Sequence, residues 1–130
     1  PPLSNGEPFS SAMRSKSTQN RIVRDRNLAG RVKDWHGRRC QVCGIRLEVE
    51  GGFYAEAAHI RPLGRPHDGP DVAENIICLC PNHHVAFDNG ALFVADDFSL
   101  VGAEGKLISV KRHRPAVEHF RYHRSIWGKV

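Results

Sequence analysis

Two pairs of potential metal ligands constrain this chain more than any other feature of its sequence. Cys40 and Cys43 are separated by two residues, and Cys80 and His83 repeat that spacing farther along the chain. Three thiolates and one imidazole are a common ligand set for a tetrahedral structural zinc ion. The spacing therefore predicts a structural zinc site that joins two distant segments.

Cys78 leaves a second ligand set open. Residues 78 and 80 would face the same side of an extended strand, so Cys78 could replace His83 in an all-cysteine site. Its alternative role is that of a small buried hydrophobic residue. The four cysteines could also form two disulfides, but the two-residue spacing next to histidines favours metal binding.

Charge and length narrow the class of protein. The 130 residues fit one domain with a tail. A net charge of +5 and a pI of about 9.4 favour a polyanionic partner such as nucleic acid, with an anionic membrane surface as the weaker alternative. No apolar run is long enough to span a bilayer and the N-terminus lacks the layout of a signal peptide, so we expect a cytoplasmic protein without a membrane partner.

Composition and periodicity predict the order of elements. Residues 1–18 are rich in Ser, Pro, Gly and Asn, which predicts a flexible linker or tail, and the missing initiator Met indicates an excised piece with a further domain upstream. The remaining pattern predicts a helix over 20–36, then a hairpin of strands 47–49 and 53–60, and a Pro- and Gly-rich loop after residue 61. A short helix is expected from Pro81, and it carries His83, His84 and Phe87. Beyond it we expect a hairpin of 92–95 with 100–101, a strand over 106–110, and a final helix after Pro115 with Val117, Phe120 and Trp127 on its packed side.

Several motifs together resemble one known family. They are Cys40-x2-Cys43, Ala57-Ala58-His59-Ile60-Arg61-Pro62, Gly69-Pro70-Asp71, Asn75, Leu79-Cys80-Pro81-Asn82-His83-His84 and Phe87-Asp88. From about Asn20 to Trp127 the chain resembles the HNH, or ββα-metal, endonucleases. In detail it is similar to the C-terminal nuclease domain of SRA-HNH proteins, which are modification-dependent restriction enzymes with a separate SRA domain that reads a modified base.

The resemblance implies a fold and a set of partners. The fold would be α+β, a small zinc-stabilised ββα-metal core with flanking helices and a short C-terminal hairpin, and the nuclease domain would occupy residues 19–130. The substrate would be DNA inside a prokaryotic cell, and an upstream domain would read the modified base. One such site should nick a single strand, so we expect double-strand cleavage to need two copies, as in a homodimer.

The resemblance also implies roles for the remaining histidines. His59, whose unperturbed pKa of about 6.5 leaves it neutral at physiological pH, would act as general base. Neighbouring residues on a helix diverge by about 100°, so we expect separate roles for His83 and His84. His83, which repeats the two-residue spacing after Cys80, would bind zinc, and the resemblance implies that His84 would bind a catalytic Mg²⁺ or Mn²⁺ ion. Asn75 would fix the loop and orient His59.

Ala58 departs from the family pattern. In many HNH enzymes the residue before the general base is an aspartate or a histidine that also binds metal. One imidazole is a thin ligand shell for a hard cation, so we expect weak binding of the catalytic ion without DNA. Asp88, four residues after His84, is a candidate extra ligand, and the end of a helix is its alternative role.

Two other classes of protein share part of this pattern. A zinc-stabilised module that binds nucleic acid without catalysis is the main alternative, although such a module needs neither His59 nor His84. A zinc deaminase does not fit, because its signature contains a His-x-Glu motif before the cysteines and none precedes Cys80.

Overall fold

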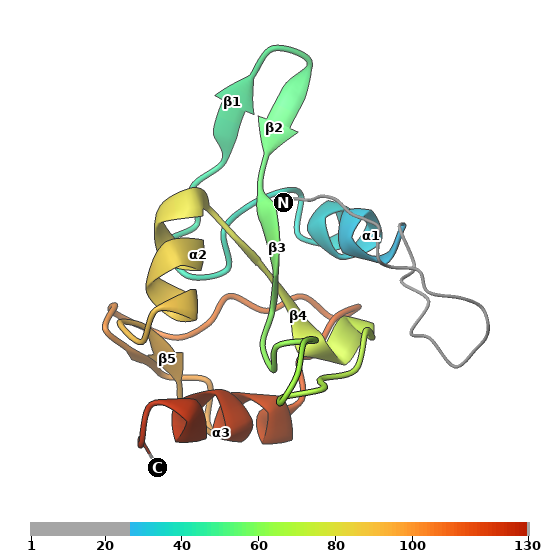
Figure 1. The fold of residues 1–130 in the computed structure, drawn as a ribbon. Coiled ribbons are helices and arrows are strands. Elements are labelled where there is room, and N and C mark those ends of the chain that lie inside the picture. Colours follow the sequence, from blue (N-terminus) through green and yellow to red (C-terminus); the bar gives the residue numbers. More distant parts are fainter. Residues whose placement is uncertain (1–26, 130) are drawn as a thin grey trace, which may run out of the picture.

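The computed structural model describes residues 27–129, so the predicted linker and the first part of the predicted helix over 20–36 lie outside the described residues. The described elements are α1 (Leu28–Trp35), β1 (Leu47–Val49), β2 (Gly52–Tyr54), β3 (Glu56–His59), the 3-10 turn η1 (Ala73–Asn75), β4 (Ile76–Leu79), α2 (Pro81–Asp88), β5 (Phe93–Val94), β6 (Leu100–Val101) and α3 (Val117–Ile126). Their arrangement is shown in Figure 1.

The centre of the molecule is a ββα unit made of β3, β4 and α2. Strands β3 and β4 are antiparallel, with Glu56 opposite Leu79 and His59 opposite Ile76. All four residues of β4 are buried, because helices cover both sides of the pair. Helix α1 packs against one side and α2 against the other (Figure 1). The unit places His59 at the end of one strand and the two adjacent histidines on the following helix.

The hairpin predicted over 47–49 and 53–60 forms only in its first part, up to Tyr54. Strand β1 pairs with the short strand β2, and the chain leaves the strand conformation at Ala55 before β3 begins. Strand β3 then pairs with β4 instead. The apolar run of β4 needs a strand partner for its buried backbone groups, and β3 supplies it. The β1–β2 hairpin is exposed and projects away from the other elements (Figure 1).

The outer elements differ from prediction at several ends. Helix α1 is the described part of the helix predicted over 20–36: it spans Leu28–Trp35 and is followed by Gly37 with a φ of +61°. The C-terminal hairpin is confirmed as β5 and β6. The strand predicted over 106–110 is absent from the described residues, where only isolated bridges at Lys106 and Val110 occur.

Helix α3 closes the main core. Its Phe120 is fully buried together with Phe87 of α2. Trp127 follows the helix, and its ring packs against Gly90 while 42% of the residue stays exposed, so its predicted place on the packed side holds for one part of the side chain. Cys40 and Cys80 belong to the same core cluster, so a metal bound by these thiolates would lie against the hydrophobic core. Within residues 27–129 no helix has both the length and the apolar character needed to cross a membrane.

Candidate active site and metal centre

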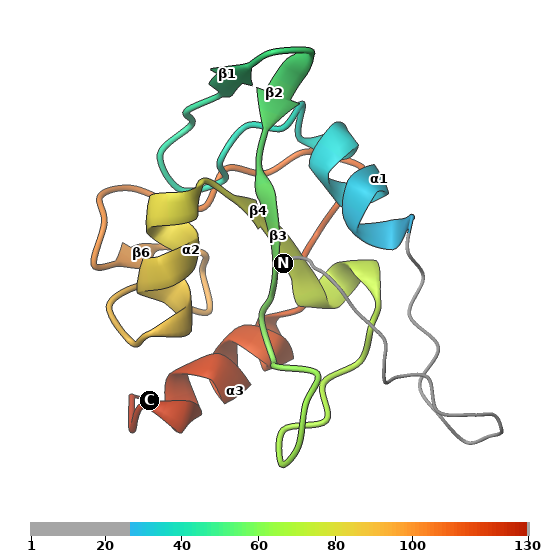
Figure 2. The ribbon, with the colours of Figure 1, turned by 45° about the horizontal axis from the view of Figure 1, so that its top comes forward.

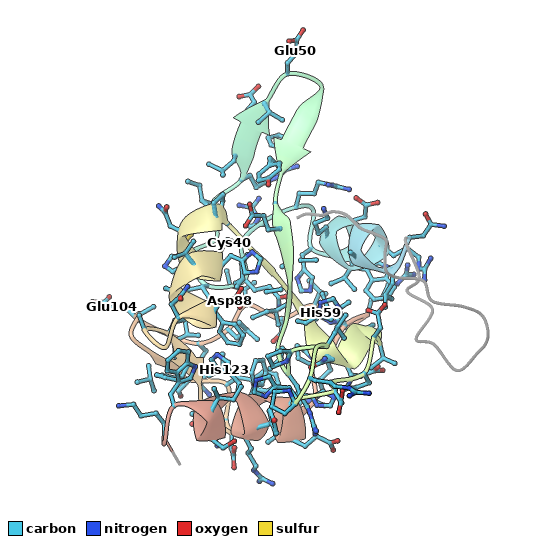
Figure 3. The ribbon with its side chains drawn as sticks, viewed as in Figure 1. Cys40, Glu50, His59, Asp88, Glu104 and His123 are labelled. Atoms are coloured by element: carbon cyan, nitrogen blue, oxygen red, sulfur yellow. The ribbon has the colours of Figure 1, made fainter. Side chains whose placement is uncertain are left out.

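The four predicted zinc ligands lie together. Cys40 and Cys43 come from the turn after α1, Cys80 is the residue that precedes α2, and His83 lies in the first turn of that helix. We call these four residues the Cys3His cluster; their ligand atoms all lie within 4.8 Å of one another. In Figure 3, Cys40 lies beside the upper end of α2.

The separations within the Cys3His cluster fit a tetrahedral ion. The Sγ atom of Cys43 lies 3.9 Å from that of Cys80, and Nδ1 of His83 lies 3.4 Å from the Cys80 sulfur and 3.8 Å from the Cys40 sulfur. Metal–sulfur and metal–nitrogen bonds of the usual length for zinc set ligand separations of about 3.6–3.8 Å in a tetrahedron. The cluster could therefore hold a metal ion.

Backbone amides prepare the first cysteine for this role. Gly44, at a φ of +79°, lets its N–H turn back to the Cys40 carbonyl at 2.9 Å. Burial acts to raise the pKa of Cys40, but hydrogen bonds from the backbone of Cys43, Cys80 and Val42 outweigh it and lower that pKa. Burial raises the pKa of Cys43 to about 11. Cysteine binds metals as the thiolate. A bound cation would therefore keep the sulfurs of both Cys40 and Cys43 ionised.

Cys78 lies outside the Cys3His cluster. Its side chain is fully buried, and burial raises the pKa of its thiol to about 12. Gln41 connects this part of β4 to the cysteine turn: its Oε1 accepts from the Cys78 N–H at 2.9 Å, and its own N–H donates to the Cys78 carbonyl at 2.8 Å. The position thus suits the small hydrophobic role rather than the all-cysteine ligand set.

His84 contacts two carboxylates. Its Nδ1 lies 2.7 Å from Oε1 of Glu56, and its Nε2 lies 3.1 Å from Oδ2 of Asp88. We call these three residues the His84 group. The hydrogen bond to Asp88, followed by that to Glu56, raises the pKa of His84 against the effect of burial. Burial acts to raise the pKa of Glu56, but hydrogen bonds from Tyr54 and His84 outweigh it and lower that pKa.

Glu56 is the residue of this site that sequence reasoning missed. Side chains two residues apart in a strand face the same side, so Glu56 shares its face of β3 with Ala58, the position where many HNH enzymes have a metal-binding aspartate or histidine. That period of two was the available signal. Carboxylate oxygens and an imidazole form a donor set that fits a hard divalent cation.

His59 faces a different carboxylate. Its Nε2 lies 2.9 Å from Oδ1 of Asp71, and the side chains are 25% and 10% exposed. In Figure 3, His59 and Asp88 lie on opposite sides of the β3 ribbon. The structure therefore places His59 and His84 in separate hydrogen-bonded groups. Strand β3 connects them, because it contains both His59 and the Glu56 that contacts His84. Asp71 was part of the sequence motif, but no role was assigned to it.

Asn75 is fully buried and fixes the loop that follows His59. Its Oδ1 accepts from the Arg61 N–H at 2.8 Å, and its Nδ2 donates to the carbonyls of Arg61 at 2.9 Å and Pro70 at 2.8 Å. Its own carbonyl accepts from the Ile60 N–H at 2.8 Å. One side chain therefore holds both ends of the loop.

Helix α3 supports the same loop from outside. Nδ1 of His67 lies 2.7 Å from the Tyr122 hydroxyl. The Arg61 guanidinium lies over the Tyr122 ring, 4.1 Å from its centroid, and its Nε donates to the His67 carbonyl at 2.7 Å. Figure 2 shows the loop beside α3. The loop is thus held by a helix far away in the sequence.

The basic C-terminal end is less available for DNA than its composition indicates. His113 and His123 are buried. Arg121 and Arg124 both donate to the Asp96 carboxylate, at 2.9 Å each. Three basic residues between 111 and 124 stay exposed without an ion pair in the described part of the chain: Lys111, Arg112 and Arg114.

Known proteins share both the sequence pattern and the fold. A family model described as HNH endonuclease matches residues 40–95, the span that contains the Cys3His cluster, the His84 group, His59 and Asn75. A solved structure described as "Modification dependent TagI restriction endonuclease" matches with 53% sequence identity and a TM-score of 0.77. That match covers 82% of this chain and 39% of the other, so this chain spans well under half of that protein. No curated protein matched the chain.

Proposed function

This chain contains an HNH endonuclease domain, and from that premise we propose that it hydrolyses phosphodiester bonds of DNA as the nuclease part of a modification-dependent restriction enzyme. The observation that carries the proposal is the ββα unit, which presents His59 and the His84 group from one strand and the helix beside it. Such an enzyme would act in the cytoplasm of a prokaryotic cell.

The Cys3His cluster is proposed to bind structural zinc. Its three sulfurs and one imidazole leave no position open for substrate in a tetrahedral site. The metal joins the turn after α1 to the start of α2, so it holds the helix that carries His84 against the core. Zinc therefore supports the nuclease site without taking part in its chemistry.

The His84 group is proposed to bind the catalytic Mg²⁺ or Mn²⁺. Glu56 supplies the carboxylate that Ala58 lacks, and Asp88 is a further oxygen donor from the same helix as His84. The bound ion would act as a Lewis acid that neutralises charge on the scissile phosphate. Tyr54, whose hydroxyl donates to Glu56 at 2.7 Å, orients that carboxylate toward His84.

His59 is proposed as the general base. Its imidazole takes a proton from the attacking water, and Asn75 keeps its end of β3 in place through the bonds on either side of the loop. Neither Asn75 nor the loop backbone reacts. Residues 19–130 are the proposed extent of this nuclease domain.

The matched restriction endonuclease is much longer than this chain, and this difference bears on the other domains and copies that the full-length protein would need. Because the match covers 39% of the restriction endonuclease, we propose that the full-length protein has a further domain, of SRA type, that reads the modified base. A single nuclease site cuts one strand. Two copies, in a homodimer or meeting on DNA, would cut both.

A nicking assay tests the proposal. Supercoiled plasmid is incubated with the chain or with its His59→Ala variant, in Mg²⁺ or Mn²⁺, at equal zinc content by elemental analysis. Loss of the general base should lower the rate about 10²- to 10⁴-fold. If both proteins bind plasmid and neither nicks it, a zinc-stabilised binding module is the better account.

A further inference from the structure

We propose that Asp71 is a positioning residue that fixes the tautomer of His59, so that Nδ1 of the imidazole is the base. The inference rests on the proposed function of His59 and deepens it. It begins from one contact, the 2.9 Å separation between Nε2 of His59 and Oδ1 of Asp71. No motif or comparison assigns a role to this aspartate.

The chemistry of the two groups determines where the proton lies. A carboxylate oxygen accepts hydrogen bonds and does not donate them. A neutral imidazole has one N–H and one nitrogen with a free lone pair. Because Nε2 faces the carboxylate, Nε2 carries the hydrogen, and Nδ1 keeps the lone pair that takes a proton from water. Without the carboxylate, this hydrogen bond no longer favours the tautomer with the proton on Nε2.

The backbone around Asp71 is held by the same residue that holds His59. Asn75 donates through Nδ2 to the Pro70 carbonyl at 2.8 Å and through its N–H to the Val72 carbonyl at 2.9 Å, so it fixes the residues on both sides of Asp71. Its carbonyl accepts from the N–H of Ile60, the residue after His59. Asn75 thus sets the separation between the aspartate and the histidine.

Burial strengthens this pair. The Asp71 side chain is 10% exposed, so few water molecules compete for its oxygen, and a hydrogen bond to an ionised group is about twice as strong as one between neutral groups. When water attacks phosphorus, its O–H bond breaks and the proton moves to Nδ1. The P–O bond to the leaving oxygen breaks, and solvent protonates that oxygen. The imidazolium that forms then lies directly against the Asp71 carboxylate, which stabilises it.

Asp71→Asn is the variant that separates tautomer control from simple packing. The amide keeps the size of the side chain, but its NH2 group can donate to Nε2 and so favour the Nδ1–H tautomer. We expect kcat for nicking to fall about 10²-fold or more, since this is the range that general-base catalysis contributes, with KM and zinc content unchanged. Asp71→Glu, which keeps a carboxylate, should recover part of the rate.

Nitrogen-15 NMR of the imidazole is the readout that does not depend on activity. In the parent chain His59, assigned by its absence from the His59→Ala spectrum, should show a protonated Nε2 and an unprotonated Nδ1, and Asp71→Asn should lose this preference. Glu74→Gln, an exposed carboxylate in η1, is the matched control and should change neither the tautomer nor kcat.

The two readouts distinguish the possible failures. A parent chain whose His59 carries its proton on Nδ1 overturns the inference. So does an Asp71→Asn variant with the parent's tautomer and kcat. A parent chain with the expected tautomer that does not cut DNA refutes the proposed function instead, and leaves the role of Asp71 in setting the tautomer standing.

Discussion

Oε1 of Glu56 lies 2.7 Å from Nδ1 of His84, although the two residues come from different elements, β3 and α2. Because Glu56 and Ala58 share a face of β3, a carboxylate reaches the helix from two residues earlier than the family pattern would place it. The longer glutamate side chain makes up for the extra distance along the strand. Glu56 is therefore a candidate donor that could complete the ligand shell that Ala58 leaves short.

Glu56→Gln should specifically weaken the binding of the catalytic ion. The amide retains the shape of the side chain but removes the negative charge that attracts a divalent cation. We expect the Mn²⁺ concentration for half-maximal nicking to rise at least about 10-fold, since even residues that only support a metal ligand typically cost 10- to 100-fold when changed.

The control for this prediction is Glu48→Gln, which removes the same charge from the exposed strand β1. Tyr54→Phe should have a smaller effect than Glu56→Gln, because it removes only the hydroxyl that orients the carboxylate. An unchanged Mn²⁺ requirement in Glu56→Gln would refute a role for Glu56 in holding the ion.

Loss of the structural metal should unfold the centre of the domain. Structural zinc in small peptides contributes about 10–16 kcal/mol of apparent binding free energy, which is as large as the whole net stability of a typical domain. We therefore expect Cys43→Ser to lose its zinc and its cooperative unfolding transition, measured by elemental analysis and circular dichroism.

Cys78→Ala is the matched cysteine variant and should keep one zinc per chain. It removes a fully buried sulfur that lies outside the Cys3His cluster, so the expected cost is a small cavity of about 1 kcal/mol. If Cys78→Ala loses the zinc while Cys43→Ser retains it, the ligand assignment is wrong.

The metal cluster and α2 could be predicted from local sequence because their signals are local. Two-residue spacing identifies Cys40, Cys43, Cys80 and His83, and Pro81 marks the start of the helix. The strand pairing could not be predicted in the same way. Nothing within residues 47–60 indicates that β3 leaves the first hairpin to pair with β4, because that choice depends on covering a buried strand far along the chain.

Asp88 beside His84 could be predicted from its helical spacing, but the other two carboxylates around the histidines were missed because they depend on pairing between distant segments. Asp71 and Glu56 reach His59 and His84 only through pairing of β3 with β4 and packing of α2 against them. Composition likewise does not reveal that Asp96 forms ion pairs with Arg121 and Arg124 in the basic C-terminal segment. Contacts between distant segments, rather than motifs, determine these roles.

Asn75→Ala should destabilise the domain and abolish nicking together. It leaves the N–H of Arg61 and the carbonyls of Arg61 and Pro70 without their partner. Each buried polar group without a partner costs about 1–3 kcal/mol, and partial rehydration of this loop brings the expected total to about 2–4 kcal/mol in urea unfolding. Asn75→Asp should not rescue activity, because a carboxylate cannot donate to the two carbonyls. Full activity in Asn75→Asp would contradict this account.

The stability of the domain should fall in mild acid because of a buried pair of histidines. Nε2 of His36 lies 2.7 Å from Nδ1 of His113, whose Nε2 donates to the Ala73 carbonyl at 2.8 Å. Burial, followed by the charge of His113, lowers the pKa of His36 to about 4. The unfolded chain binds this proton near its ordinary pKa of about 6.5. The stabilisation is therefore complete above pH 6.5 and is lost as the pH falls from 6.5 toward 4, by about 2 kcal/mol between pH 7 and pH 5.

Urea unfolding of the parent and of His36→Asn across this range measures it, because any acid release of metal is common to both proteins and cancels in the difference. If the free energies of unfolding of the two proteins change in parallel between pH 7 and pH 5, His36 does not carry this dependence.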